Sequence, residues 1–373
     1  MQVFVHTVGV LSSVSSQAVN LSYSESPIHR LPVELLQHVF LLIIKDVPDY
    51  PSIFSFGGTT ISGNFARPPL LFTRVCRLWR AVAHSTTGIW SHIKVGLPTE
   101  SFPLKPFLPS LLRSWLAWSG SQPLTIRMEY ISPSVHGHFC PSNTQLLEIL
   151  FAETTRWETV FCMFDVFERS ENFNAPQLRT LQCNWPSDVT RFNAPNLRRI
   201  RFGPLSAVIR SRPTATCKNI RHLRIQSAPV AVIHSSLSFF PHVETLVIDY
   251  YIAPNSDSGS HTTTYSCLES MTIPLFHYHY HRDPFIELFR GLRLPMLQKL
   301  NVVGNPDTPE VEGIITALAV AESCNIQVVD FQPRFWTNAR RNNVYIRVEP
   351  LLSVAREVAI CGEVVARRAL GTT

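Results

Sequence analysis

The chain has 373 residues, of which 45% are hydrophobic and 16% are charged, and its formal net charge is +6. This length allows two domains, and this composition supports a globular protein. The longest apolar run, Leu35 to Ile44, is far shorter than the roughly 20 residues that a transmembrane helix needs, so no membrane span is expected.

The eight cysteines form no Cys-x-x-Cys pair, which favours reduced thiols and a cytoplasmic or nuclear protein over a disulfide framework. Residues 1–27 are mildly apolar and rich in serine, and they lack the basic segment of a secretory signal. We expect them to form a flexible N-terminal tail.

Residues 28–95 predict a small helical module. Pro32 suits the first turn of a helix, and Glu34 in the same turn favours the helix dipole. Apolar residues follow at helical spacing: Leu35, Leu36, Val39, Phe40 and Ile43. A second helix is predicted from about Leu71 to Ala83. Residues 48–69 between them are rich in Pro, Gly, Ser and Thr and predict an exposed insertion.

These two halves resemble an F-box. Leu31-Pro32-Val33-Glu34-Leu35-Leu36 matches its first part, and Val75-Cys76-Arg77-Leu78-Trp79-Arg80 with the following Trp90 matches its second. The long insertion resembles the variant common in F-box-like proteins of mushroom-forming fungi. F-box segments dock on the Skp adaptor of cullin–RING ubiquitin ligases through an apolar helical surface. The resemblance implies these adaptor-binding residues: Leu31, Pro32, Leu35, Leu36, Val39, Phe40, Val75, Cys76, Trp79 and Trp90.

The residue pattern alone supports another interpretation equally well. Large apolar residues are usually core, so the same side chains would be the interior of a helical cap on the following domain.

Residues 96–156 are expected to link this module to a second domain. They predict helices at Leu108–Trp118 and Leu146–Ala152, with a strand at Leu124–Met128 between them.

From residue 157 to 373 we predict a repeating second domain. An apolar-x-x-apolar-x-apolar pattern recurs at intervals of 19 to 29 residues and resembles a leucine-rich repeat. The copies begin at Trp157, Leu178, Leu197, Ile220, Val243, Leu268 and Leu297. Each copy predicts a short strand whose apolar row is buried only by stacked neighbours. No regular Asn follows the strands, so we expect the solenoid to be irregular. The expected fold class is mixed α/β, with the strands of the solenoid in a parallel sheet. The alternative is a chance recurrence of Leu-rich strands in an ordinary α/β fold.

Elements are also predicted toward the end of the chain. Helices are expected at Phe285–Leu292 and Val311–Ala321, and terminal strands that cap the stack at Ile326–Phe331 and Val344–Val348.

The neighbours of the inward residues point outward in a strand, so stacked parallel strands would place them on one concave surface. Residues 189–243 contain no Asp or Glu but nine Arg or Lys. Arginine grips carboxylate or phosphate in a bidentate fork, which suggests an acidic or phosphorylated target protein. The candidate target-binding residues are Arg199, Arg201, His222, Arg224 and Gln226. A solvated basic face without a ligand is an equally weighted alternative.

The sequence contains no glycine-rich phosphate loop, zincin motif or nucleophile elbow, so we expect neither intrinsic catalysis nor a cofactor. The segment His277–His281, with its three histidines, is better interpreted as an aromatic loop or strand than as a metal site. Nucleic acid is an unlikely partner, because no recognition motif accompanies the basic charge. The sequence therefore predicts the substrate receptor of a Skp–cullin–F-box ubiquitin ligase. The second hypothesis is a repeat scaffold for protein interaction that joins no ligase.

Overall fold

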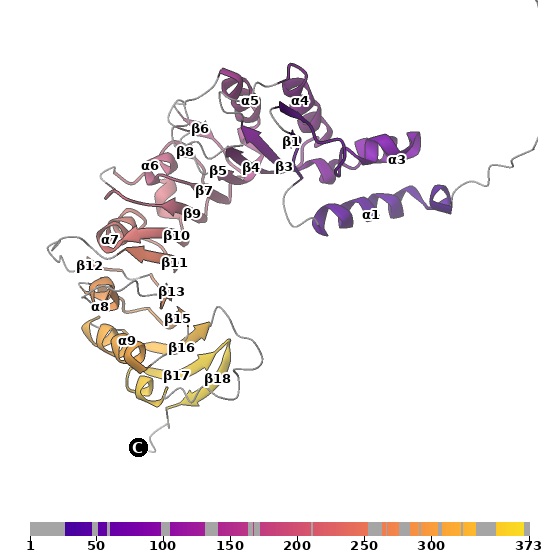
Figure 1. Ribbon diagram of the computed structural model, residues 1–373. Coiled ribbons are helices and arrows are strands. Elements are labelled where there is room, and N and C mark those ends of the chain that lie inside the picture. The colour runs from indigo at the N-terminus through magenta and orange to yellow at the C-terminus, as the bar shows by residue number, and fades with distance from the viewer. Residues whose placement is uncertain are drawn as a thin grey trace, which may run out of the picture.

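A computed structural model describes the following residues of the chain: 27–46, 51–57, 60–97, 105–130, 141–162, 167, 172–209, 212–252, 263–265, 267–275, 284–290, 292–304, 308–321, 324–332 and 348–368. They form a mixed α/β solenoid in which helices and strands alternate along a curved stack (Figure 1).

A sheet of 12 strands lines the concave side of the stack, and helices α6, α7, α8 and α9 lie on the convex side (Figure 1). The spatial order is β18-β17-β16-β15-β13-β11-β10-β9-β7-β5-β4-β3, and every neighbouring pair is parallel except β17 and β18. The expected solenoid with a parallel sheet is therefore confirmed. Its strands are β3 (His92–Leu97), β4 (Leu124–Tyr130), β5 (Trp157–Cys162), β7 (Thr180–Cys183), β9 (Arg199–Pro204), β10 (His222–Pro229), β11 (Thr245–Ile252), β13 (Ser270–Pro274), β15 (Lys299–Val303), β16 (Ile326–Gln332), β17 (Ala355–Ile360) and β18 (Glu363–Arg367).

Helices precede, connect and follow these strands. The α-helices are α1 (Val33–Asp46), α2 (Phe72–Val75), α3 (Arg77–Ser85), α4 (Leu108–Trp118), α5 (Pro141–Phe151), α6 (Pro186–Val189), α7 (Val230–Phe239), α8 (Pro284–Phe289) and α9 (Thr308–Val320). The 3-10 helices are η1 (Pro27–Arg30), η2 (Thr87–Trp90), η3 (Thr154–Arg156), η5 (Thr216–Asn219) and η7 (Glu349–Ser353). Three two-stranded sheets complete the fold: β1 (Phe54–Gly57) with β2 (Thr60–Gly63), β6 (Phe173–Asn174) with β8 (Phe192–Asn193), and β12 (Thr263–Thr264) with β14 (Leu292–Arg293).

The apolar rows of the repeats form one continuous core. Leu181 pairs in register with Ile200, which pairs with Leu223, and Leu223 pairs with Leu246. All four side chains are buried, as are the leading residues of the seven predicted copies. The repeat pattern thus identifies the interior of the solenoid correctly.

The sheet is longer than the sequence predicts. Strands β3 and β4 belong to it, so the expected boundary at Trp157 is not a break in the structure. At the other end β16 is confirmed, but the last parallel strand is Ala355–Ile360, 29 residues after Ile326. The predicted strand at Val344–Val348 lies outside the described residues except for Val348, which is not in a strand.

Most described residues of the insertion predicted at residues 48–69 are buried or half-buried, Ala66 and Arg67 being exposed, which corrects the expectation of an exposed segment. Its described part forms the β1–β2 hairpin, and Ile53 and Phe54 are buried. Ser52 makes a parallel bridge with Lys94 of β3, so the insertion packs on the end of the large sheet. The physical reason is that the insertion carries apolar residues that the stack can cover.

The helix predicted from Leu71 to Ala83 is also interrupted. Cys76 is extended, with φ −156° and ψ 176°, and separates α2 from α3. Its Sγ accepts a hydrogen bond from the Trp79 backbone N–H at 3.4 Å and caps α3. The side chain of Cys76 therefore has a local structural role.

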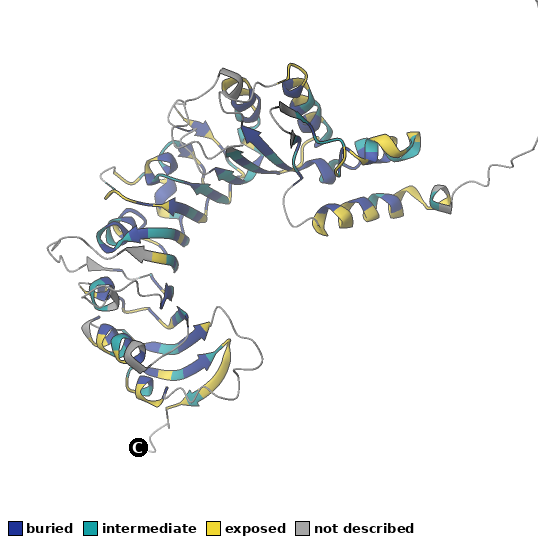
Figure 2. Ribbon diagram, viewed as in Figure 1, coloured by how far each residue is buried: buried dark blue, intermediate teal, exposed yellow. Residues whose placement is uncertain are grey.

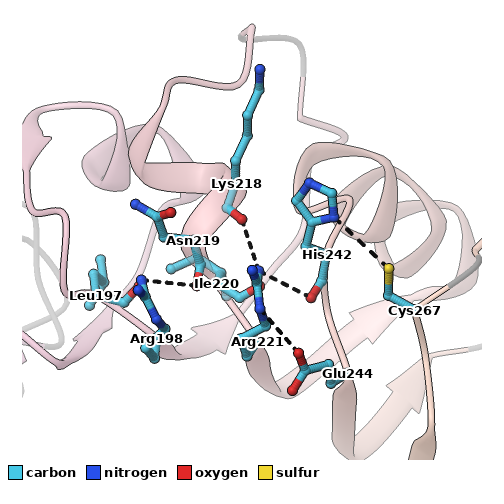
Figure 3. A network of polar contacts seen from close by, with 9 residues as sticks. All are labelled: Leu197, Arg198, Lys218, Asn219, Ile220, Arg221, His242, Glu244 and Cys267. Carbon is cyan, nitrogen blue, oxygen red and sulfur yellow. Dashed lines mark hydrogen bonds and ion pairs between the residues drawn. The ribbon is translucent and has the colours of Figure 1, made fainter.

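Two arginines, each directly before a strand, bridge consecutive repeats (Figure 3). Nη1 of Arg221 donates to the carbonyls of Lys218 at 2.9 Å and Ile220 at 3.2 Å, and at 3.5 Å to the carbonyl of His242 in the next repeat. Arg198 occupies the equivalent position one repeat earlier and reaches the carbonyl of Asn219 at 3.4 Å. These guanidinium groups satisfy turn carbonyls that strand pairing leaves free.

We expect Arg221→Met to lower the free energy of unfolding by roughly 1–2 kcal/mol, because the turn carbonyls lose a charged donor. The control is Arg179→Met, at the equivalent position of an earlier repeat. Arg179 is exposed, and its ion pair with Glu158 spans 3.6 Å, so a loss below about 0.5 kcal/mol is expected. Urea unfolding measures both, and equal losses would contradict the bridging role.

The solenoid should lose stability in mild acid through His234. Burial lowers the pKa of His234, although the hydrogen bond that Nε2–H donates to the Leu288 carbonyl at 2.8 Å raises it. The unfolded chain therefore binds a proton near pH 6.5 more readily than the folded chain does. The free energy of unfolding should be greatest above this pH and fall as the pH drops below it. His234→Gln keeps a hydrogen-bond donor but cannot titrate. Between pH 7.5 and 5.5, about one unit on either side of the ordinary histidine pKa, its free energy of unfolding should therefore decrease less than that of the wild type. An equal decrease in both proteins would contradict this.

Candidate functional site

The helical module at the N-terminal end has its own aromatic core. Phe40 of α1 stacks on Phe72 of α2 with ring centroids 4.2 Å apart, and it meets Trp79 of α3 edge-on at 5.0 Å. Leu36 and Ile44 lie one helical turn to either side of Phe40 and are buried with it. One stripe of α1 therefore holds the module together.

Trp90 joins this module to the solenoid. Its Nε1–H donates to the carbonyl of Ala83 at 2.7 Å, and its own carbonyl accepts from Trp115 Nε1–H at 2.8 Å. The two indoles meet edge-on at 5.0 Å, and Trp118 packs at 4.7 Å from Trp90 and stacks with His84 at 4.5 Å. This cluster fixes α3 against α4, the first helix of the stack.

Three of the ten predicted adaptor-binding residues are therefore corrected. Leu36, Phe40 and Trp90 are completely or almost completely buried, so they form the interior of the module and do not reach its surface. Cys76 and Trp79 are partly buried: Trp79 packs against the core, and Cys76 caps α3. For these residues the interpretation as core residues is the better one.

The remaining predicted residues lie on the outside. Leu35 is 52% exposed and Val75 is 53% exposed, and Leu31, Pro32 and Val39 are exposed too. Figure 2 shows α1 exposed along the side opposite to its buried stripe. Leu35, Val39 and Leu42 follow one another at spacings of 4 and 3, which is one face of a helix. We call the following residues the exposed apolar surface of the module: Leu31, Leu35, Val39, Leu42, Leu71 and Val75.

The five predicted target-binding residues lie together on the concave face. Arg199 and Arg201 of β9 are paired in register with His222 and Arg224 of β10, and Gln226 follows on β10. Their side chains are exposed or half-buried, whereas Ile200 and Leu223 between them are buried. The alternation predicted from the repeat pattern is confirmed here.

These residues differ in how they are paired. Both ends of the Arg224 guanidinium bond to the carboxylate of Asp249, at 3.0 and 2.8 Å. Arg199 and Arg201 have no carboxylate partner among the described residues. Burial, with the charge of Arg199 second, lowers the pKa of His222, while Glu244 opposes the shift. His222 is thus predominantly neutral at neutral pH, and the site's charge comes from the arginines.

A shallow open cavity of about 420 Å³ lies beside Arg199. It is lined by Arg179, Thr180, Asn196, Arg198, Arg199 and His222. Arg179, Asn196 and Arg198 are not among the residues predicted from the sequence for this site. They precede the strands, so they do not take part in the alternation of inward and outward residues within the strands. A signal existed, since Pro-x-Leu-Arg occurs in successive repeats, ending at Arg179 and at Arg198.

Neighbouring residues of α1 should respond oppositely to truncation. Leu36→Ala should lower the free energy of unfolding by roughly 2–5 kcal/mol, because it opens a cavity beside Phe40. Leu35→Ala should change it by less than about 0.5 kcal/mol, because Leu35 is exposed. Chemical denaturation of both variants provides the measurement. A large loss for Leu35→Ala would mean that this face is covered within the chain.

Two further properties concern only the part of the chain that the structure describes. It contains no group of three or more His, Cys, Asp or Glu side chains placed to hold a metal ion, and His277–His281 lie outside that part. Among its helices, none has the length and apolar character needed to cross a bilayer. No protein-family model matches the chain, and no curated protein matches it.

Proposed function

We propose that the chain is the substrate receptor of a Skp–cullin–F-box ubiquitin ligase. The helical module docks on the Skp-type adaptor, and the concave face of the solenoid holds a target protein. The observation that supports this most is the exposed apolar surface of a module whose own core is already complete.

The aromatic contacts and indole hydrogen bonds that hold the module together do not involve the exposed apolar surface. The module is held together by Phe40, Phe72 and Trp79, and it is held to the solenoid by Trp90 and Trp115. Fully burying an exposed Leu or Val side chain contributes roughly 1.5–3 kcal/mol, and each side chain of the exposed apolar surface, being about half exposed, would contribute less than that. Clustered exposed apolar residues mark interaction sites more often than isolated ones do. Leu31, Leu35, Val39 and Val75 also occupy the positions by which this segment resembles an F-box.

The joint between the two parts suits a receptor. Trp90 is buried between the module and α4, and its indole N–H and backbone carbonyl are both bonded. A joint of this kind holds the target at a defined position relative to the adaptor. In this proposal the chain has no chemistry and no cofactor of its own, because proximity to a partner enzyme promotes ubiquitin transfer.

The target in this proposal is an acidic or phosphorylated protein of the cytoplasm or nucleus. Arg199 and Arg201 supply positive charge on the concave face without a carboxylate partner in the described part of the chain. Arginine forms short, charge-assisted bonds with carboxylate and phosphate.

A second candidate is a protein-interaction scaffold that joins no ligase. The hairpin β1–β2 favours it, because this insertion packs on β3 and departs from a compact F-box. The helical module would then be a cap on the first strands of the solenoid.

Co-expression with a Skp-type adaptor separates the two candidates. The wild-type chain should retain the adaptor through purification, and Leu35→Asp/Val75→Asp should lose it, with affinity reduced at least about 30-fold because two central apolar contacts become charged. The matched control is Val208→Asp/Met296→Asp, which charges two exposed apolar residues of the solenoid. It should retain the adaptor. If the wild type binds no adaptor, or if both double variants lose the adaptor equally, the ligase proposal fails and the protein-interaction scaffold becomes the better hypothesis.

A further inference from the structure

Charged side chains on the concave face are paired toward both ends of the solenoid. At the N-terminal end, Lys94 of β3 lies 2.8 Å from Glu129 of β4, and Arg127 contacts the same carboxylate. Toward the C-terminal end, Lys299 lies 3.7 Å from the nearly buried Asp330. These cations are therefore each within ion-pair distance of a carboxylate, although Lys94 and Arg127 share a single one.

The centre of the face is different. On β9, Arg199 and Arg201 have no carboxylate within ion-pair distance among the described residues, and the next basic residue, Arg224, is held by Asp249. The unpaired positive charge is therefore concentrated on one strand. Its position follows from strand register, because Arg199 and Arg201 lie beside Thr180 and Gln182 of β7 and not beside acidic residues.

The cavity next to Arg199 is lined mostly by hydrogen-bond donors. Thr180 brings a hydroxyl, Asn196 an amide, and Arg179 and Arg198 their guanidinium groups, and no carboxylate lines it. Arg198 is already engaged with the carbonyls of Pro195 and Asn219, so it contributes charge more than free donors. Among the three arginines of the cavity, Arg199 is the one whose donors have no carboxylate or carbonyl partner in the described part of the chain.

The spacing of the two free arginines matches an extended chain. They are two residues apart on one face of β9, and a strand rises about 3.3 Å per residue, so their Cα atoms are about 6.6 Å apart. In an extended peptide, side chains two residues apart have the same spacing and the same direction. A peptide lying along β9 would thus present alternate side chains to Arg199 and Arg201.

We infer that Arg199 and Arg201 form a two-point receptor for an extended acidic segment with oxyanions at alternate positions, the first of which enters the cavity beside His222. The inference deepens the proposed function and rests on it for the identity of the ligand as a target protein. Carboxylate and phosphate share this chemistry. A nucleic acid fits less well, because the free charge spans a single strand and no Phe, Tyr or Trp lines the cavity for base stacking.

Fluorescence polarisation on the full chain, without adaptor, tests the receptor. The probes are short labelled peptides that carry aspartate, phosphoserine or asparagine at every second position, and a labelled single-stranded oligonucleotide. The aspartate or the phosphoserine peptide should bind and the asparagine peptide should not, and the stronger of the two charged peptides identifies the source of the oxyanion.

Arg199→Gln/Arg201→Gln should weaken binding of the charged peptide at least about tenfold, because each arginine loses a charge-assisted contact. The control Arg212→Gln/Arg356→Gln removes the same net charge from two exposed arginines that do not line the cavity, and it should stay within about twofold.

A gain-of-binding variant keeps the test independent of folding losses. Asp249→Asn releases Arg224 beside Arg201, so the charged peptide should bind at least about threefold more tightly. Glu349→Gln raises the net charge by the same amount at an exposed residue of η7 and should have little effect. The inference is overturned if no charged peptide binds, if the two arginine double variants lose equal affinity, or if the oligonucleotide binds more tightly than both charged peptides. Because the assay contains no adaptor, its failure leaves the adaptor-binding result standing, and the reverse also holds.

Discussion

The whole structure depends on the fact that no repeat can bury its own apolar row. Leu181, Ile200 and Leu223 are covered because each lies in register with its neighbour on the next strand. A shift of one residue would turn such a row toward solvent, so the parallel register is strongly specified. The same constraint makes the two ends of the stack special. The antiparallel strand β18 completes one end, and the helical module with the β1–β2 hairpin covers the other.

Because the inward rows alone specify the solenoid, the outward residues are free to vary in charge. The concave face uses this freedom unevenly, with ion pairs near its ends and unpaired arginines on β9. Three arginines of the solenoid have three different roles, according to their place in the repeat. Arg221 bridges turn carbonyls, Arg224 is held by Asp249, and Arg199 faces solvent beside a cavity. The position of an arginine in the repeat therefore decides whether its side chain is held within the structure or is available to a ligand.

The sequence predicts the parts of the fold that depend on local periodicity. The strands of the seven repeats are found because their apolar pattern recurs, and the helix Leu108–Trp118 is predicted with its observed bounds. The hairpin at Phe54–Gly63 is missed because its strands are short, and Ile53 becomes core only through contact with the distant β3. The burial of Trp90 and the ion pair of Arg224 are missed for a related reason. Each depends on residues that tertiary packing or strand register brings together, which composition and spacing do not reveal.

The separation between core and surface on α1 has a consequence for how the two faces act together. Leu36 and Phe40 are committed to the module, while Leu35 and Val39 beside them are not, so a partner can cover the second pair without disturbing the first. Trp90 then connects this module to α4, because its indole N–H donates to Ala83 and its backbone carbonyl accepts from Trp115. In the proposed receptor, the packed core of the repeats between the exposed apolar surface and β9 would hold the adaptor and the target in a fixed relation.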